Sequence, residues 1–526
     1  MTTVPTLVPE PRECIDLGGT LQLSDVVAVA GPAGITATIA DLLGEGIGAI
    51  LLPRSVAASP EHEPVVLTVD QGDHPPGGYG LSVDDSGITI EYADHEGLVN
   101  AVQTLRQLAG PAAFSRGHVP GSRPSLPHVR ITDAPALAWR GVHLDVARHF
   151  MPLVNLYDFV DNLALHKINV LHLHLTEDQG WRFEVKKYPR LTEVGSWRTG
   201  TRFPDWDEDD QVPHGGHYTQ DQLRALVGHA HSRGITIVPE IDLPGHVSAL
   251  LAAHPEYGEP GNLPDGVATG WGIFTEVLHL DDAAMELVTD ILAELLEVFD
   301  SPWIHVGGDE CPRDQWRNSE RARTLAAERG LASVDELQPW FTQQLRSWLA
   351  DRGRTLVGWD EIIDDDAQVP GAVVMSWRGT EPGLRALAAG HQVVMAPGST
   401  LYLDKYASDD PTEPRAIGGH IPWEKVASMD PYEGVEDDQR DGLLGIQAQL
   451  WSEYLVTPQR VEYAAYPRVS VMAEVAWRGG PVDPDQFRPR LAAHLERLAV
   501  RGVNYRPLDG PLPWQTGGGR YRRIAK

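Results

Sequence analysis

Eight short runs of β-branched residues and leucine follow one another beyond Ala136, and the segments between them have the amphipathic period of helices. One such segment places Leu156, Phe159, Val160 and Leu163 on a single helical face. Because consecutive parallel strands are joined by helical crossovers, this alternation predicts an α/β fold in which eight βα units close into a (β/α)8 TIM barrel. An open, doubly wound parallel sheet is the alternative. The expected strands are 142–145, 170–175, 235–239, 303–306, 355–358, 372–376, 392–395 and 443–449.

The first part of the chain has a different pattern. Two strand-like runs, 81–83 and 88–92, flank the turn Asp84-Asp85-Ser86-Gly87, and a helical pattern covers 97–108. Four prolines at residues 111–127 interrupt both the strand pattern and the helical pattern and mark a linker. We therefore expect a small α+β domain at residues 1–135 and the barrel at residues 136–526.

Charge and cysteine content restrict the class of partner. The 526 residues carry 43 Lys and Arg against 74 Asp and Glu, a net charge of -31, which argues against binding to nucleic acid or an anionic membrane. A neutral substrate fits better. Cys14 and Cys311 are the two cysteines, and we expect both to be free thiols. The first 16 residues lack a basic cluster followed by an apolar run, and no stretch reaches the roughly 18 apolar residues of a membrane span, so we expect a cytoplasmic location.

Reactive groups of such barrels come from the carboxyl ends of the strands, so the residues that follow each run are informative. They include acids, one histidine, one arginine and several aromatic residues. Aromatic rings cover the apolar face of a sugar, and carboxylates and arginine bind its hydroxyls, so this set predicts a sugar-binding pocket without any cofactor. The residues are Arg148, Glu177, Asp178, Glu240, Asp242, His246, Asp309, Glu310, Trp359, Trp377, Tyr402, Asp404, Trp451 and Glu453.

Asp309 and Glu310 are consecutive and follow the pair Gly307-Gly308, which permits a sharp turn and a close approach of ligand. Their Cα atoms are about 3.8 Å apart, so they are poorly placed to flank a glycosidic bond from opposite sides. A substrate with a 2-acetamido group offers its own carbonyl oxygen as nucleophile. Glu310 then serves as general acid and later as base, while Asp309 holds the acetamido N–H.

Four strand-end segments, LDVARHF, HLTEDQGW, PEIDLPGH and HVGGDE, occur in this order along the chain. In these segments the chain resembles the family 20 glycoside hydrolases, the β-N-acetylhexosaminidases, and the resemblance covers nearly the whole length, including the small domain. It implies a retaining exo-hydrolase that removes non-reducing terminal β-linked GlcNAc, or GalNAc, through an oxazoline intermediate. It also implies an oligosaccharide or glycoconjugate as partner and no metal or other cofactor.

The resemblance assigns expected roles to the pocket residues. Arg148 and Glu453 would bind the sugar hydroxyls O3 and O4, and Asp404 the hydroxyls near O4 and O6. Tyr402 would hydrogen-bond the acetamido oxygen alongside Asp309. The walls of the acetamido pocket and of the sugar face would be Trp359, Trp377 and Trp451.

Two further expectations concern departures from the family pattern. His246 would lie behind Glu310 and tune its protonation with an acidic partner, which is usually aspartate in the family and is Glu177 at the matching position here. Some bacterial relatives carry a tryptophan that stacks on the leaving sugar where this chain has Ile417, so weaker stacking is expected at that subsite.

Two other functions are consistent with part of the pattern. His172 and His174 point to one face of their strand, and with His246, His305 and an aspartate they could form the site of a metal-dependent amidohydrolase. Because the pair lies within the strand rather than at its end, we expect both rings to be hydrogen-bonded in the barrel interior. A non-catalytic amino-sugar-binding protein is the other alternative, although such a protein has no need of the Asp309–Glu310 pair.

Overall fold

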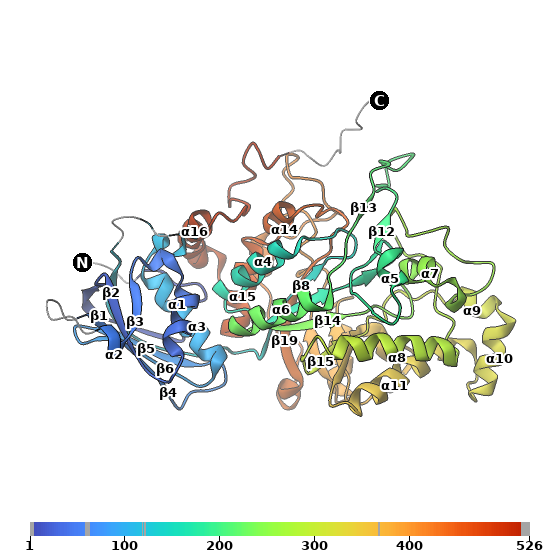
Figure 1. Ribbon diagram of the computed structural model, residues 1–526, viewed down its shortest axis with the longest axis horizontal. Helices are drawn as coiled ribbons and strands as arrows, with labels where there is room; N and C mark the ends of the chain where they lie inside the picture. Colours follow the sequence, from blue (N-terminus) through green and yellow to red (C-terminus); the bar gives the residue numbers. More distant parts are fainter. Residues whose placement is uncertain (1–4, 58–63, 118, 120–122, 367–368, 517–526) are drawn as a thin grey trace.

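The structure is a computed structural model that describes residues 5–57, 64–117, 119, 123–366 and 369–516. A small α/β unit lies at one end, drawn in blue, and a barrel surrounded by helices forms the rest, drawn from cyan to red (Figure 1). None of the helices among the described residues is long and apolar enough to cross a membrane.

The barrel is closed by eight parallel strands in the order β14-β15-β16-β17-β18-β19-β8-β9, which confirms the predicted fold class. Closure occurs between β19 and β8, where Gly445 pairs with Trp139 and Leu450 with Leu144. Each strand lies within one residue of its predicted bounds except at the start of β8, which begins three residues earlier. The strands are β8 (Trp139–Asp145), β9 (Val170–His174), β14 (Thr236–Glu240), β15 (Trp303–His305), β16 (Thr355–Trp359), β17 (Val373–Ser376), β18 (Gln392–Met395) and β19 (Leu443–Leu450).

Alternation along the strands divides the barrel into an interior and an outer layer. On β9, Val170 belongs to the interior cluster, whereas Leu171 and Leu173 belong to the core between strands and helices. Since successive side chains point to opposite faces, His172 and His174 face the interior, and both are fully buried.

Helices cover the outside of the barrel with one apolar face each. The predicted face of Leu156, Phe159, Val160 and Leu163 is buried on α4. The helices of this part are α4 (Leu153–Leu165), α5 (Arg190–Glu193), α6 (Gln220–Ser232), α7 (Ser248–Ala253), α8 (Asp282–Leu296), α9 (Asp314–Asn318), α10 (Glu320–Glu328), α11 (Leu337–Ala350), α12 (Glu381–Ala388), α13 (Trp423–Ala427), α14 (Pro458–Ala465), α15 (Arg468–Arg478) and α16 (Pro484–Arg501).

Short elements lie in the loops that join strands and helices. Two small antiparallel ladders stand over the carboxyl ends of the strands, β10 (Thr176–Glu177) with β11 (Gly180–Trp181), and β12 (Trp197–Arg198) with β13 (His214–Gly215). The 3₁₀ turns of this part are η3 (Pro255–Tyr257), η4 (Val334–Glu336), η5 (Asp360–Asp366) and η6 (Asp437–Gly442).

The small unit is a seven-stranded mixed sheet in the order β1-β7-β5-β6-β4-β2-β3. The predicted hairpin is present, with β5 and β6 joined by the turn at residues 84–87. The last residues of the predicted linker belong to strand β7, whose Pro127 pairs with Thr20 of β1. The elements are β1 (Glu13–Gln22), β2 (Val26–Ala30), α1 (Ile35–Leu43), η1 (Glu45–Ile47), β3 (Ile50–Pro53), α2 (Arg54–Ala57), β4 (Val65–Gln71), β5 (Tyr79–Asp84), β6 (Gly87–Tyr92), α3 (His95–Leu108), η2 (Pro111–Phe114) and β7 (Ser125–Asp133).

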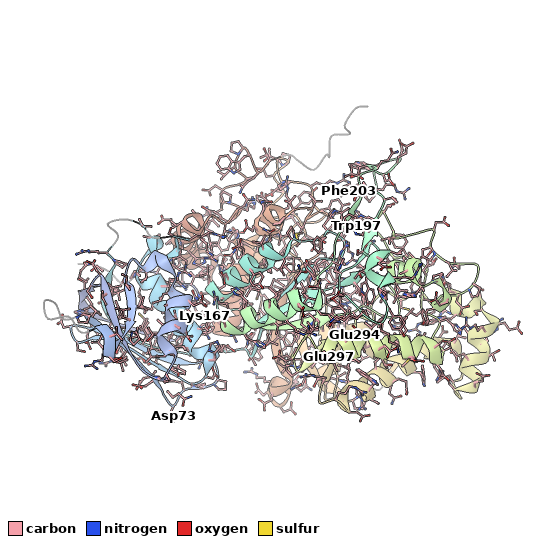
Figure 2. The ribbon with its side chains drawn as sticks, in the orientation of Figure 1. Asp73, Lys167, Trp197, Phe203, Glu294 and Glu297 are labelled. Atoms are coloured by element: carbon pink, nitrogen blue, oxygen red, sulfur yellow. The ribbon has the colours of Figure 1, made fainter. Side chains whose placement is uncertain are left out.

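Helix α3 joins the two units. Its N-cap is Asp94, whose side chain accepts a hydrogen bond from the Gly97 amide, and every residue from Gly97 to Leu108 is buried. It packs on β5 and β6 on one side and on α4 of the barrel on the other, and Figure 1 places it between the blue sheet and the barrel. Lys167, two residues after the end of α4, is labelled at the same junction in Figure 2.

Candidate active site

A cavity of about 460 Å³, which we call the first cavity, opens at the carboxyl ends of the barrel strands. Eight of the residues predicted from the sequence line it together with Ile417. These eight residues are Arg148, Asp309, Glu310, Trp377, Tyr402, Asp404, Trp451 and Glu453.

The acid pair reaches the first cavity through a turn that glycine makes possible. Gly307 and Gly308 follow β15 with φ angles of 67° and 99°. A Cβ atom on Gly307 would lie 1.7 Å from the Asp242 Oδ1 atom, so a close approach does require glycine there. The neighbour that fills this space is the Asp242 side chain, rather than the ligand that the sequence suggested. Glu310 itself has a φ of 47°, an unusual conformation that turns its side chain toward the cavity.

The two acids differ in exposure. The Glu310 side chain is 34% exposed, and burial together with the adjacent Asp309 carboxylate raises its pKa. Asp309 is 13% exposed, and its Oδ1 atom has no hydrogen-bond partner among the described residues. Glu310 therefore holds its proton more strongly than an ordinary glutamate does. Asp309 has an oxygen free to accept a hydrogen bond from a ligand.

His246 lies directly behind the acid pair. Its Nε2 atom is 3.8 Å from Asp309 Oδ2 and 3.7 Å from Glu310 Oε2. Its Nδ1 atom is 2.9 Å from Glu177 Oε1 and 3.2 Å from Asp178 Oδ2. Burial opposes protonation, but the Glu177 and Asp178 carboxylates raise the pKa of His246 well above its ordinary value.

Glu177 thus reaches His246 despite its extra methylene, and Asp178 reaches it as well. Asp178 is the more firmly fixed of the two acids, because its Oδ1 atom accepts hydrogen bonds from the amide and the hydroxyl of Ser248 at 2.9 and 2.7 Å. Glu177 is shared, since its Oε1 atom also lies 2.6 Å from Arg148 Nη2. Asp178 has no role in the sequence-based expectation, and the geometry makes it a second acidic partner of His246.

Arg148 also lines the first cavity. Its guanidinium contacts Glu177 and Asp145 and lies over the Trp451 ring, 4.9 Å from its centroid. Burial alone would lower the pKa of Arg148, but the Glu177 and Asp145 carboxylates raise it, so the group is always charged. Its Nε atom is buried without a partner among the described residues.

Two further acids face the same region with raised pKa values. Burial raises the pKa of Asp404 to about 8, with a further contribution from the Glu453 carboxylate. Burial also raises the pKa of Glu453, against the opposing effect of Arg148. A protonated carboxyl donates as well as accepts, so this end of the cavity suits a ligand rich in hydroxyl groups.

The aromatic residues form one wall of the first cavity. Trp377 and Tyr402 stack with ring centroids 6.0 Å apart and an interplanar angle of 25°. The indole N–H of Trp377 donates to Glu361 Oε2 at 2.9 Å, which fixes the ring plane. Trp451 completes the wall against Arg148.

The structure does not bring Trp359 to the cavity lining, where the sequence analysis expected it. Trp359 is 1% exposed and lies below the cavity, with its indole N–H donating to Glu240 Oε1 at 2.9 Å. It contacts Trp451 from beneath, at a centroid distance of 5.7 Å. It therefore supports the wall rather than forming it.

The histidines of the barrel interior gather around the carboxylate of Glu240. Glu240 has contacts with His174 Nδ1, with His172 Nε2 at 3.0 Å and with His305 Nδ1 at 2.9 Å. Ligand atoms of several such groups lie within 4.8 Å of one another, including His143, His172 and Glu240. Glu240 accepts hydrogen bonds from His174 and from Trp359. His172 Nδ1 accepts a hydrogen bond from the Gln447 side-chain amide at 3.0 Å, so both rings are hydrogen-bonded in the barrel interior, as expected.

Some cavity residues were not found from the sequence. Gln179 and Lys405 lie beside strand-end residues, but Trp271 and Ile273 belong to the long loop after α7 and follow no strand. Trp271 is held in place by Phe203, at a centroid distance of 5.9 Å, and by the Arg198 guanidinium at 5.3 Å. A loop that folds back over the barrel carries no strand-end signal in the sequence, so these two residues were not predictable from strand positions.

The two cysteines are free, as expected. Cys311 follows Glu310, and burial raises the pKa of its thiol to about 12, so the group stays protonated. Cys311 is half-buried and packs against the apolar core, so its protonated thiol is a packing group rather than a nucleophile.

A (β/α)8 barrel with paired acids, a fixed arginine and an aromatic wall at its carboxyl end defines the class of barrels built to hold a sugar. The chain belongs to glycosyl hydrolase family 20. The profile of the family's catalytic domain matches residues 137–480, and that of the family's domain 2 matches residues 4–134.

Individual relatives agree with this assignment. The chain is 37% identical over 521 residues to a β-hexosaminidase of Porphyromonas gingivalis, covering 97% of this chain and 65% of that one. It is 33% identical over 499 residues to a β-N-acetylhexosaminidase of Cellulomonas fimi, covering 92% and 91%. It spans 65% and 64% of the lengths of the Porphyromonas gingivalis and Vibrio furnissii relatives, about two thirds in each case.

Solved structures give the same result. The exo-β-N-acetylglucosaminidase of Vibrio harveyi, in complex with N-acetylglucosamine, superposes with a TM-score of 0.82 at 28% identity, covering 97% of this chain and 79% of that one. The family 20 β-N-acetylhexosaminidase of Streptomyces coelicolor has a TM-score of 0.80 at 27% identity, covering 96% and 98%.

Proposed function

We propose that the chain is a retaining exo-β-N-acetylhexosaminidase that removes terminal β-linked GlcNAc, or GalNAc, from the non-reducing end of an oligosaccharide or glycoconjugate. The observation that carries the proposal is the consecutive pair Asp309–Glu310 with His246 within 4 Å of both carboxylates. Membership of glycosyl hydrolase family 20 and the names of the relatives support it.

The terminal sugar is proposed to fill the first cavity. Arg148, Asp404 and Glu453 offer donors and acceptors to its hydroxyls, and the Trp377–Tyr402–Trp451 wall covers its apolar face and the acetamido methyl group. Arg148 and Asp404 line the cavity and are both buried, and we infer that the glycan does not continue beyond the hydroxyls that they bind. This arrangement would limit the chain to exo action.

In the first step the protonated Glu310 gives its proton to the glycosidic oxygen as the bond from that oxygen to C1 breaks. The acetamido carbonyl oxygen forms a new bond to C1 from the opposite face. Asp309 accepts a hydrogen bond from the acetamido N–H through its unpartnered Oδ1 atom and so stabilises the positive charge of the oxazolinium ring. The leaving sugar departs as an alcohol.

In the second step water attacks C1 and gives a proton to the Glu310 carboxylate, while the bond between C1 and the acetamido oxygen opens. Two inversions at C1 give net retention. The protonated His246 stands between the two acids and the Glu177–Asp178 carboxylates, and it stabilises the anionic form of Glu310 that this step requires.

Release of p-nitrophenol from the β-N-acetylglucosaminide, compared with the plain β-glucoside and with and without EDTA, tests the proposal. Cleavage of the acetamido substrate alone, unaffected by EDTA, is expected. EDTA-sensitive cleavage would favour the metal-dependent alternative, with a metal ion taking part in hydrolysis, and no cleavage of either glycoside would favour an amino-sugar-binding protein.

Two variants and one inhibitor test the mechanism. Glu310→Gln should lower hydrolysis of chitobiose by several orders of magnitude and spare substrates with good leaving groups, whereas Asp309→Asn should slow the first step for both kinds of substrate. A thiazoline analogue of GlcNAc should be a tight competitive inhibitor, because it mimics the cyclised intermediate. Its failure to inhibit would indicate an enzymic nucleophile.

A further inference from the structure

A second cavity of about 670 Å³ lies next to the first. The two cavities share the segment Trp271-Gly272-Ile273, which forms the wall between them. Ile273 is 57% exposed on this wall. A molecule whose end occupies the first cavity can therefore continue over Ile273 into the second.

The dividing wall is held firmly by backbone contacts. The amide of Ala268 donates to the Asp178 carbonyl at 3.1 Å, and the Arg202 amide donates to the Thr269 carbonyl at 2.8 Å. The Gln179 side chain donates to the Gly270 carbonyl at 2.9 Å. Asp178 also contacts His246, which lies behind Asp309 and Glu310. The same residue therefore anchors both the dividing wall and the histidine behind the acid pair, and the second cavity has a fixed position relative to the first.

Trp197 is the most prominent side chain of the second cavity. It is 53% exposed, which is unusual for a tryptophan. It pairs with Gly215 across the β12–β13 ladder, and a Cβ atom on Gly215 would lie only 2.7 Å from the Trp197 ring. The absence of a side chain on Gly215 therefore lets the indole lie against the β13 backbone. Figure 2 labels Trp197 beside Phe203, above the barrel. The ring is a supported platform with much of its surface open.

Polar groups that are not used elsewhere surround this platform. The side chains of Arg202 and Asp265 line the second cavity and make no hydrogen bond or ion pair with the rest of the described residues. The Oε2 atom of Glu276 is buried, again without a partner in the described part of the chain. A guanidinium and two carboxyl groups supply both donors and acceptors around an aromatic surface, and this combination suits a neutral ligand with an apolar face and many hydroxyls.

We propose that the second cavity binds the inner sugar residues of the substrate, so that the chain acts best on neutral β-linked oligosaccharides of three or more N-acetylhexosamine units. The inference rests on the proposed function, which places the terminal sugar in the first cavity. The inner sugars leave that cavity past Ile273, and one of them stacks on Trp197.

Chain-length dependence of hydrolysis tests the inference. We expect kcat/KM to rise from the chitin disaccharide to the tetrasaccharide for the unmodified chain. Trp197→Ala should lower kcat/KM for the tetrasaccharide about three- to tenfold, the range expected for one aromatic contact, and leave p-nitrophenyl β-N-acetylglucosaminide unchanged. Arg202→Met should give the same selective loss.

Trp514→Ala is the matched control, because Trp514 is 75% exposed and lines neither cavity. It should leave every substrate unchanged, and melting temperatures should show that all variants fold. Equal kcat/KM for the disaccharide and tetrasaccharide, or an equal loss on the p-nitrophenyl substrate in Trp197→Ala, would overturn the inference and leave the proposed function standing. Failure of the unmodified chain to cleave the p-nitrophenyl substrate would instead overturn the proposed function, and the inference with it.

Discussion

Glu361 shows how one buried carboxyl group can control both the shape and the charge of the first cavity. Its carboxylate accepts a hydrogen bond from the Trp377 indole N–H. Burial together with the Asp309 and Asp360 carboxylates raises the pKa of Glu361 to about 8. We predict that Glu361→Ala raises KM for the p-nitrophenyl substrate about tenfold with a smaller effect on kcat, because the Trp377 ring loses the hydrogen bond that fixes it in the cavity wall, a bond worth about 0.5–1.5 kcal/mol. Steady-state kinetics would measure the change.

Glu361→Gln separates the two roles of this side chain. Glutamine retains an acceptor for Trp377, so KM should stay within about twofold of the original. In the original chain, ionisation of Glu361 near pH 8 places a negative charge beside Asp309. Glutamine cannot ionise, so any change in kcat/KM near pH 8 that this charge causes should be absent from the variant. Identical KM values for the alanine and glutamine variants would contradict the positioning role.

The sequence predicted the acids of the site better than its aromatic wall. Asp309, Glu310 and His246 follow strands and were found by position, whereas Glu361 lies in a 3₁₀ turn and contacts Trp377 only after folding. Trp359 ends a strand, but it shares the interior face with Val357, two residues earlier. The last residue of a strand points into the barrel interior or into the cavity above it, according to the alternation of side chains along that strand. The sequence pattern did not show where each strand ends relative to this alternation.

At the scale of elements, the turn between β15 and the acid pair depends on Gly307. We predict that Gly307→Ala abolishes most activity and lowers the free energy of unfolding by more than the roughly 1–2 kcal/mol that a left-handed conformation costs an L-residue, because the new methyl group must displace Asp242. Gly353→Ala is the matched control, with a φ of 70° and no atom within 4 Å of the added group. Denaturant unfolding and the p-nitrophenyl assay would measure both effects, and equal losses in the two variants would contradict the proposed clash.

The strand bounds were predictable because seven of the eight strands consist mainly of β-branched and other apolar residues. Strand β8 is the exception at its start, where Trp139 and Arg140 do not match the apolar pattern. Both are about 1% exposed. Trp139 packs on Trp303 inside the barrel, and Arg140 pairs with Glu96 of the small domain. Their partners come from distant parts of the chain, so local periodicity could not identify them as strand residues.

At the scale of the whole molecule, a buried ion pair joins the small domain to the barrel. Lys167 Nζ lies 2.9 Å from Asp133 Oδ2, donates to the Tyr79 hydroxyl at 2.8 Å and lies 4.3 Å from the Trp477 ring centroid. We predict that Lys167→Met lowers the free energy of unfolding by about 3 kcal/mol or more, because Asp133 is left buried without its cation. Asp25→Asn removes the exposed pair with Arg123 as a control and should cost less than about 1 kcal/mol. Equal losses in the two variants would mean that the buried pair does not hold the domains together.

Acid should destabilise the folded chain through histidines that are buried in the neutral form. His166 bonds to the Asn162 carbonyl, the Ser470 hydroxyl and the His494 ring, and burial lowers its pKa to about 4. In the unfolded chain its pKa is about 6.5. Between these two values the unfolded state binds a proton that the folded state does not, so the contribution of His166 to stability falls by about 1.4 kcal/mol per pH unit as the pH decreases from about 6.5 to about 4.

Buried acids act in the opposite direction over the same range, so the pH dependence of the original chain alone does not isolate the effect of His166. The raised pKa of Asp404, about 8, means that its folded form keeps a proton that the unfolded form has lost, and its destabilising effect therefore decreases as the pH falls. The comparison with His166→Gln removes this term, because Asp404 is common to both chains. The variant should be less stable at pH 7, where the hydrogen bonds of His166 are lost, and the difference should shrink by about 1.4 kcal/mol per pH unit below pH 6.5 in urea unfolding. Parallel stability curves for the two chains between pH 7 and pH 5 would mean that His166 accepts a proton within the folded core.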